Sequence, residues 1–386
     1  MGIPCITLRS MGKNIPLSMP NINEEDIEAV SAVLRSSRLS LGPKLAEFEH
    51  AFAEYVGVKH AVAVSSGTAA LHLCLRALGI KDGDEVITSP FSFIASSNCM
   101  LFERAKPVFV DVLPDTFCLD PAKVESAITP KTKAILGVDI LGYLAEWRDL
   151  KTIAEKHDLL LIEDSCEALG TTKDGAKAGT FAECGVFGFY PNKQMTTGEG
   201  GMIVTDRNDI AAAACSMRNQ GRDEGAGFLD HKRLGYNYRI SDINCALGLS
   251  QLKRVPELIQ KRSTVFAWYA EELADVAEII HVPSRQIGVD VSWFIYVIHL
   301  AERFCIADRD RLITHLQKNG IGCNTYFPSI HLQSFYRDMF GYKEGDFPIA
   351  ESASARGIAL PFYSDLLKEE VVYVCKVLKN GLCSLS

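Results

Sequence analysis

The sequence predicts an α/β protein whose larger domain holds a mostly parallel central sheet flanked by helices. Short apolar runs alternate with helical patterns through the first two thirds of the chain, which is typical of βαβ units. The chain has 386 residues, 47% of them apolar and 23% charged, so it can bury a sizeable core. The pattern changes after about Thr264, and we therefore predict a large domain at residues 1–263 and a smaller α+β domain at residues 264–386.

The strands and helices of the larger domain follow from local patterns. An apolar run at residues 61–64 ends in small polar residues, and a helix is predicted from residue 69 to 78, closed by Gly79. A second helix is predicted over residues 147–157. The other predicted strands are residues 85–88, 107–111, 134–138, 159–162, 186–189 and 202–205. Only a turn-rich stretch separates the last two, so the simple alternation is expected to stop there.

Helical spacing also marks the ends of this domain. Apolar side chains recur at the spacing of one helix face upstream, at Leu45, Phe48, Phe52 and Tyr55. A helix is predicted at residues 243–259, where Pro256 would kink or interrupt it. For the smaller domain we predict strands at residues 293–300 and 321–324, and helices at residues 307–318 and 369–378.

Charge and cysteine spacing exclude several classes of protein. The formal charge is −8, which disfavours nucleic-acid binding because phosphate backbones attract excess Lys and Arg. Twelve scattered cysteines without a C-x-x-C pair, and histidines without H-E-x-x-H spacing, predict no metal site and reduced thiols in a cytoplasmic protein. Residues 1–13 have no apolar run typical of a secretory signal, and no run approaches the ~20 apolar residues that span a membrane.

The first candidate site is Ser66-Gly67-Thr68, between a predicted strand and a predicted helix. Free backbone N–H groups and the positive end of the helix dipole favour a phosphate or carboxylate there. The alternative is an ordinary capped helix start, which is common.

Two further candidates follow later strands. Asp164 comes at the carboxyl end of a predicted parallel strand, where open α/β sheets bind ligands, and it could hold a positive ring nitrogen or a metal. Lys193 follows an aromatic strand and precedes the glycine-rich turn at residues 198–201; a lysine in a partly apolar pocket can form Schiff bases. The alternatives are a solvated turn at Asp164 and a plain hairpin loop at Lys193.

The three candidates together match the needs of pyridoxal 5′-phosphate (PLP). The helix start would hold the phosphate, the carboxylate of Asp164 would keep the pyridine nitrogen protonated, and Lys193 would form the imine and move protons.

The chain also resembles the DegT/StrS-type nucleotide-sugar aminotransferases, which are fold type I PLP enzymes. The resemblance extends from residues 15–18 to residues 359–363 and is closest to perosamine synthase-like members. The stretches that carry it are SSGTAAL at 65–71, IEDSCEALG at 162–170, FYPNKQMTTGEGG at 189–201 and LGYNYRISDINCALGL at 234–249.

This resemblance implies a role for each matching position. Lys193 is the Schiff-base lysine, Asp164 is the partner of the pyridine nitrogen, and Ser66, Gly67 and Thr68 hold the phosphate. The ring of Phe93 stacks on the cofactor, although core packing is its alternative. Glu167 occupies a position of Gln or Glu, where it contacts the phenolate oxygen if protonated or turns to the substrate amine.

The resemblance further implies a homodimer with shared active sites. Asn237 matches a residue that reaches the phosphate of the neighbouring subunit. Arg239, Tyr326 and His331 are candidate substrate contacts; loop capping is the alternative for Asn237 and Arg239, and a structural histidine is the alternative for His331.

Three positions depart from the family pattern. Gly188 stands where many relatives have a serine that binds the phosphate, so this contact must come from elsewhere. Asp139 and Tyr143 stand where relatives often have histidines, which weakens any transfer of substrate identity.

The implied activity is transfer of an amino group from L-glutamate to a nucleotide-linked keto sugar, a 4-keto-6-deoxy sugar by resemblance, with ping-pong Schiff-base chemistry. Three alternatives stay open. A cyclitol-ketone aminotransferase would share the cofactor motifs, and a PLP-binding regulatory protein would lack turnover. A sugar dehydratase of the same scaffold would carry histidine in place of Lys193.

Overall fold

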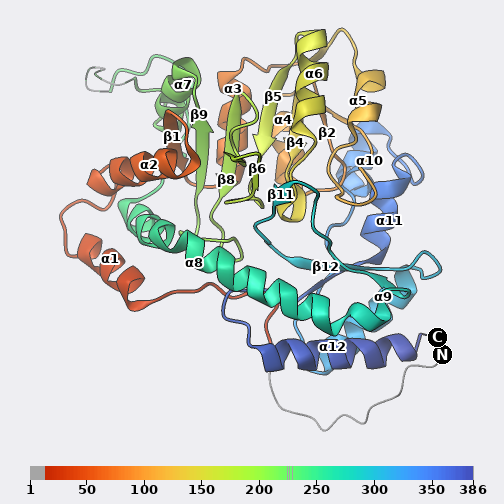
Figure 1. Ribbon diagram of the computed structural model, residues 1–386. Coiled ribbons are helices and arrows are strands. Elements are labelled where there is room, and N and C mark those ends of the chain that lie inside the picture. The colour runs from red at the N-terminus through yellow and green to blue at the C-terminus, as the bar shows by residue number, and fades with distance from the viewer. Residues whose placement is uncertain (1–13, 224, 226, 228, 386) are drawn as a thin grey trace.

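A seven-stranded mixed sheet lies at the centre of the larger part of the molecule (Figure 1). This computed structural model describes residues 14–223, 225, 227 and 229–385, so the expectation for residues 1–13 lies outside it. In sheet order the strands are β1 (His60–Val64), β9 (Gly201–Thr205), β8 (Cys184–Gly188), β5 (Leu160–Asp164), β4 (Thr132–Val138), β2 (Glu85–Thr88) and β3 (Lys106–Phe109).

The pairing of these strands confirms a mostly parallel sheet. The pairs β2–β3, β2–β4, β4–β5 and β5–β8 are parallel, whereas β9 is antiparallel to both β1 and β8. The reversal falls where only a turn-rich stretch separates β8 from β9, without the crossover helix that a parallel connection uses. The strands β1, β2, β5 and β8 therefore all end at the same edge of the sheet.

Helices flank this sheet (Figure 1). They are α2 (Pro43–Val56), α3 (Gly67–Ala77), α4 (Ala95–Phe102), α5 (Pro121–Ala127), α6 (Trp147–His157) and α7 (Asn208–Arg218). Helix α1 (Glu24–Leu34) lies apart from the sheet and packs on the long helix α8 (Asp242–Glu272). The apolar stripe of α2 packs as its spacing predicts: the ring of Phe52 lies 5.2 Å from that of Phe187 and 5.5 Å from that of Phe189. The short strands β6 (Thr172–Lys173), β7 (Ala176–Lys177) and β11 (Val289–Asp290) form a small separate sheet.

The C-terminal part combines a three-stranded antiparallel sheet with helices. Its strands are β10 (Ile280–His281), β12 (Tyr296–Leu300) and β13 (Gly357–Leu360), and its helices are α9 (Ile306–Lys318), α10 (Ser334–Phe340), α11 (Pro348–Arg356) and α12 (Lys368–Cys383). The α+β character of this part is as predicted, and the long helix α8 leads into it (Figure 1).

Several element boundaries differ from the prediction. Helix α8 continues through Pro256 to Glu272, so Pro256 does not end the helix. The boundary near Thr264 falls within this long helix and stays a prediction. The predicted strand at residues 321–324 is wrong, because Ile321 and Asn324 form only isolated bridges, to Ile15 and Ala359. Strand β12 starts at residue 296 rather than 293, because its ladder with β13 ends at the Tyr296–Leu360 pair and the next residue opposite, Pro361, has no N–H to donate.

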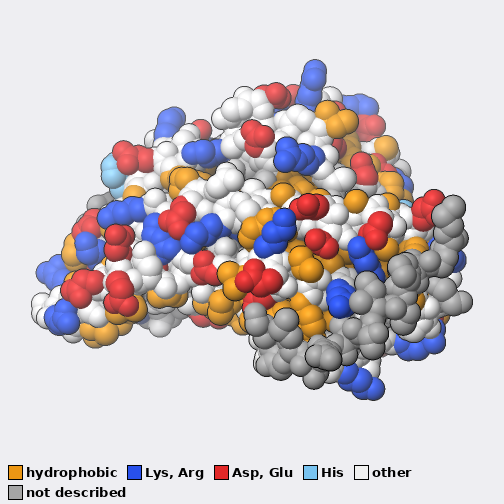
Figure 2. All heavy atoms as spheres, turned by 60° about the horizontal axis from the view of Figure 1, so that its bottom comes forward, with side chains coloured by type: hydrophobic (Ala, Val, Ile, Leu, Met, Phe, Trp, Pro, Cys, Tyr) orange, Lys and Arg blue, Asp and Glu red, His pale blue; other side chains and the backbone are white. Residues whose placement is uncertain are grey.

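The face that carries α8 and α12 shows basic and acidic side chains interspersed (Figure 2). Among the described residues, no helix combines the length and apolarity needed to cross a membrane.

The start of α3 is held in place by a close backbone contact with β9. A Cβ on Gly201 would stand 2.5 Å from the carbonyl carbon of Ser66 and 2.7 Å from the amide nitrogen of Gly67. We expect Gly201→Ala to displace this turn and to lower the free energy of unfolding by about 1–3 kcal/mol in urea titrations.

The matched control is Gly227→Ala, since among the described residues the atom nearest to a Cβ there is the Asp230 Cβ, at an ordinary 3.9 Å. Equal stability of the two variants would contradict the expectation.

Candidate active site

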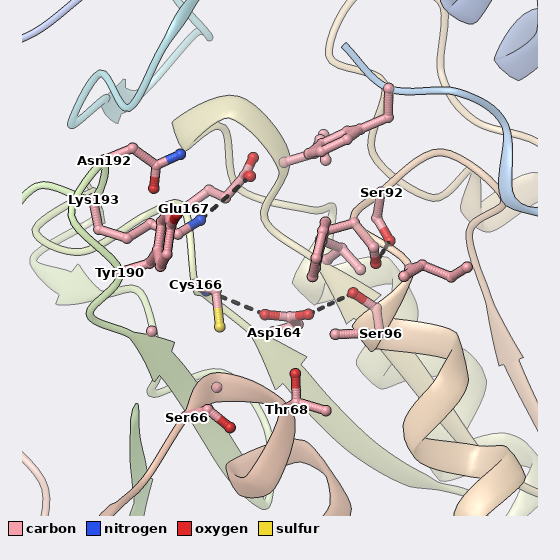
Figure 3. Close-up of a pocket in the computed structure, with 18 of the residues that line it drawn as sticks. Ser66, Thr68, Ser92, Ser96, Asp164, Cys166, Glu167, Tyr190, Asn192 and Lys193 are labelled. Atoms are coloured by element: carbon pink, nitrogen blue, oxygen red, sulfur yellow. Dashed lines mark hydrogen bonds and ion pairs between the residues drawn. The ribbon is translucent and has the colours of Figure 1, made fainter. Parts of the chain in front are cut away.

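A cavity of about 880 Å³ opens at the edge of the sheet where β1, β2, β5 and β8 end (Figure 3). Its lining comes from segments far apart in sequence. The predicted site residues that line it are Ser66, Gly67, Thr68, Phe93, Asp164, Glu167, Lys193 and Tyr326.

One end of the cavity is the first turn of α3. Ser66 caps this helix, and its Oγ accepts a hydrogen bond from the N–H of Ala69 (3.1 Å). The capping alternative is therefore correct for the Ser66 side chain, but it leaves the N–H groups of Gly67 and Thr68 without partners in the helix, because the first N–H groups of a helix have none. These two N–H groups and the helix dipole make this end of the cavity suited to an anion.

Asp164 is the last residue of β5 and is buried at the base of the cavity. Its two oxygens have separate donors: Ser96 Oγ donates to Oδ2 (2.7 Å) and the N–H of Cys166 donates to Oδ1 (3.2 Å) (Figure 3). The side chain is thus a fixed, buried acceptor and not part of a solvated turn.

Lys193 reaches into the cavity from the loop after β8. Its Nζ lies 3.5 Å from Glu167 Oε1 and 4.1 Å from the centre of the Phe294 ring. The amine is thus mostly buried between one carboxylate and one aromatic face, which hold it in a fixed place in the cavity.

Glu167 is a buried carboxylate with three partners. Oε2 accepts from the N–H of Leu141 (2.8 Å), while Oε1 accepts from the hydroxyl of Tyr326 (2.9 Å) and faces Lys193. Burial raises the pKa of Glu167, and the charge of Lys193 opposes this rise. The contacts of both oxygens favour the ionised carboxylate in the protein without bound ligand.

A buried arginine on α8 fixes the backbone that carries Lys193. Arg262 donates through Nη2 to the carbonyls of Asn192 (3.2 Å) and Lys193 (3.0 Å), and through Nη1 to that of Phe294 (2.8 Å). Burial lowers the pKa of Arg262 to about 10. Arg262 therefore ties together Lys193 and the aromatic ring that packs on its amine.

Next to Asp164 lies a pair of acidic residues, Asp139 and Glu163, that does not line the cavity. Asp139 and Glu163 are fully buried and both contact the hydroxyl of Ser165, at 2.8 Å each. Asp139 also accepts from Trp147 Nε1 (2.9 Å), so it supports the fold behind the site. Tyr143 likewise lies outside the cavity, where its hydroxyl donates to the carbonyl of Ser284 (2.9 Å).

Three predicted site residues lie away from the cavity of their own chain. Asn237 is exposed beside Asn219, and Arg239 donates to the side-chain oxygen of Asn219 (3.0 Å). His331 is fully buried, and its Nε2 pairs with Glu351 (3.1 Å). This environment favours the structural alternative for His331 over a substrate contact.

Phe93 lines the cavity and is 59% exposed, so the core-packing alternative is wrong. At Gly188, a Cβ would lie 3.4 Å from Cys166 Sγ. The thiol of Cys166 thus lies next to the space that the serine side chain of relatives would occupy at Gly188.

Sequence reasoning missed several cavity residues, among them Ser92, Ser96, Cys166, Tyr190 and Asn192. The sequence does indicate that Ser96 lies near the cavity, because Ser96 follows β2, and β2 ends at the same edge of the sheet as β5. Among the described residues, no group of three or more His, Cys, Asp or Glu side chains is arranged to hold a metal ion.

Residues 20–379 match the DegT/DnrJ/EryC1/StrS aminotransferase family. A GDP-perosamine synthase of Caulobacter vibrioides is 38% identical over 370 residues, which cover 95% of this chain and 98% of that protein. Among solved structures, the PLP form of Spr1654 from Streptococcus pneumoniae has a TM-score of 0.92 at 30% identity, covering 97% of this chain and 100% of that one. PseC of Helicobacter pylori, an aminotransferase involved in pseudoaminic acid biosynthesis, has a TM-score of 0.90 at 32% identity, with coverages of 95% and 99%.

The contacts of Glu167 give a test of its charge state. Glu167→Gln would place an NH₂ group against one of two donors, Leu141 N–H or Tyr326 O–H. We expect this variant to lose about 1–3 kcal/mol of unfolding free energy in urea titrations of the unliganded protein.

The matched control is the double variant Glu167→Gln with Tyr326→Phe, in which the amide can turn its NH₂ toward the side that has lost the Tyr326 hydroxyl and keeps only the more distant Lys193 amine. We expect the double variant to lose less than the sum of the two single losses. Additive losses would contradict the assigned contacts.

The buried acids Asp139 and Glu163 predict a pH dependence of stability. Burial raises the pKa of Asp139 to about 6 and that of Glu163 well above its usual value. In the unfolded chain both titrate near ~4, so between pH ~4 and the raised values the folded state binds more protons. Stability contributed by this pair therefore falls as the pH rises, by up to about 1.4 kcal/mol per pH unit for each group.

Glu163→Gln imitates the protonated acid and removes one of these groups. Between pH 5 and 7 we expect its unfolding free energy, measured in urea without ligand, to fall less steeply than that of the wild type. Parallel pH profiles would show that Glu163 is already ionised in the folded protein.

Proposed function

The chain belongs to the DegT/DnrJ/EryC1/StrS aminotransferase family, and on this basis we propose that it moves an amino group from L-glutamate to a keto sugar carried on a nucleotide. It is a PLP-dependent aminotransferase by family and by fold. The observation that carries the proposal is that Asp164 and Lys193 face one cavity, together with an open helix N-terminus (Figure 3).

The cavity residues fit PLP. The N–H groups of Gly67 and Thr68 would hold its phosphate, Asp164 its ring nitrogen, and the amine of Lys193 its aldehyde carbon. The buried Oδ1 of Asn192 has no hydrogen-bond partner among the described residues, as expected of a cavity built around a polar ligand. When bound, the cofactor supplies a cationic ring that stabilises negative charge on the α-carbon of the amino donor.

Lys193 acts as the proton carrier in this proposal. With the amino donor in the cavity, the free Nζ of Lys193 would take the proton from the donor α-carbon and hold it for return at the end of the transfer. Glu167, 3.5 Å away, stabilises the resulting ammonium and keeps it directed into the cavity. With the keto sugar, Nζ moves protons in the reverse direction.

The charge of the cavity supports a shared site. Lys193 is the one basic side chain among the described residues that line it, and that amine is committed to the chemistry. A nucleotide diphosphate carries negative charge that needs further donors. We propose a homodimer in which the exposed Asn237 serves the neighbouring site and further groups from that subunit complete the substrate pocket.

The name of the Caulobacter relative supports a 4-keto-6-deoxy sugar as acceptor. A cyclitol ketone is the second candidate acceptor, since the cofactor end of the cavity would be the same. The presence of Lys193 argues against a dehydratase, and its contacts with Glu167 and Phe294 argue against a regulatory protein without turnover.

The amino-donor reaction has a direct spectroscopic test. The protein loaded with PLP is expected to absorb in the visible range and to bleach when L-glutamate is added. Lys193→Ala should fold normally but lose at least about a thousandfold in amino transfer, because the nucleophile and proton carrier are removed.

The control is Lys318→Ala, which changes an exposed lysine near the end of α9. If no amino acid bleaches the visible band, the result favours a PLP-binding regulatory protein without turnover. Substantial activity of Lys193→Ala would remove this residue from its role.

A panel of acceptors identifies the second substrate. The enzyme in the amino form is mixed with nucleotide-linked 4-keto-6-deoxy sugars and with cyclitol ketones, and the return of the visible band is recorded. We expect recovery with at least one nucleotide sugar; recovery with cyclitol ketones alone would overturn that part of the proposal.

A further inference from the structure

Ser96 is a buried serine in the first turn of α4, 2% exposed, and it lies across the cavity base from β5. Its hydroxyl donates to Asp164 Oδ2 at 2.7 Å, although 68 residues separate the two along the chain (Figure 3). Serines near helix starts often bond to their own backbone instead. The direction of this hydroxyl is therefore set by the carboxylate.

The carboxylate of Asp164 is fixed by donors on both oxygens. The N–H of Cys166 holds Oδ1, and Ser96 holds Oδ2. The N–H of Cys166 belongs to the same loop as Asp164, two residues on, and moves with it. Ser96 is the donor that ties the carboxylate to a different element, so rotation of the Asp164 side chain requires loss of this bond.

We propose that Ser96 is a positioning residue that aims the charged carboxylate of Asp164 at the ring nitrogen of PLP. This inference rests on the proposed function. A hydrogen bond to a charged oxygen is stronger than one between neutral groups, and its loss leaves a buried oxygen unpaired. The cofactor would then meet a carboxylate that is free to turn away from it.

Three variants separate this role from a structural one. Ser96→Ala removes the hydroxyl, and Ser96→Thr keeps one. Ser97→Ala is the matched control, because Ser97 is equally buried on the same helix and is not one of the two donors to Asp164. Thermal unfolding without cofactor shows whether each variant folds.

The decisive measurement uses two cofactors. Apoprotein is titrated with PLP and with 1-deaza-PLP, in which carbon replaces the ring nitrogen. For Ser96→Ala we expect an affinity loss of about tenfold for PLP and less than about twofold for the deaza analogue, because the latter offers Asp164 nothing to hold. Ser96→Thr should retain most of the PLP affinity, and Ser97→Ala should match the wild type.

Either of two results would overturn the inference: wild-type PLP affinity in Ser96→Ala, or an equal loss with both cofactors, which indicates a general disturbance of the cavity. If Ser96→Thr does not fold, the PLP affinities of Ser96→Ala and Ser97→Ala still test whether Ser96 positions Asp164. If the visible band of the wild-type protein does not bleach with glutamate, that result counts against the proposed function instead. The affinities for PLP and 1-deaza-PLP would still test the positioning role of Ser96.

Discussion

Parallel pairing brings the carboxyl ends of several strands to one edge of the sheet, and the whole candidate site depends on this. Asp164 ends β5, and Lys193 lies just beyond β8, the strand paired to it. The capped turn at Ser66 follows β1, which β9 links to β8. A hydrophobic sheet thereby gathers polar groups that are far apart in the sequence, without requiring any of them to be near one another along the chain.

Burial of charge at this edge is balanced by local partners. Lys193 faces Glu167, and Asp164 accepts two hydrogen bonds from neutral donors. Arg262 donates through both Nη atoms to carbonyl oxygens instead of a carboxylate, so it orders the backbone without neutralising an acid that the chemistry needs. Such contacts hold charged groups in one orientation, which is the main contribution a rigid site makes to polar chemistry.

Those parts of the site that follow directly from strand ends could be predicted from the sequence. Asp164, Lys193 and the turn at Ser66 each combine a recognisable local pattern with a predictable place at the sheet edge, and all three line the cavity. Ser96 and Arg262 could not be assigned roles, because their partners are set by packing between distant elements. The strand predicted at residues 321–324 fails for a similar reason: its pattern is apolar enough, but the neighbours give it only isolated bridges.

Helix α8 has a mechanical consequence for the whole chain. It packs on α1 and α2 near its start and on α12 near its end, with 31 residues in one uninterrupted run. Melting of the C-terminal part would fray the same helix that supports the N-terminal part and would release Arg262 from the Lys193 loop. The two parts should therefore denature in a single cooperative transition, with no stable half-molecule left behind.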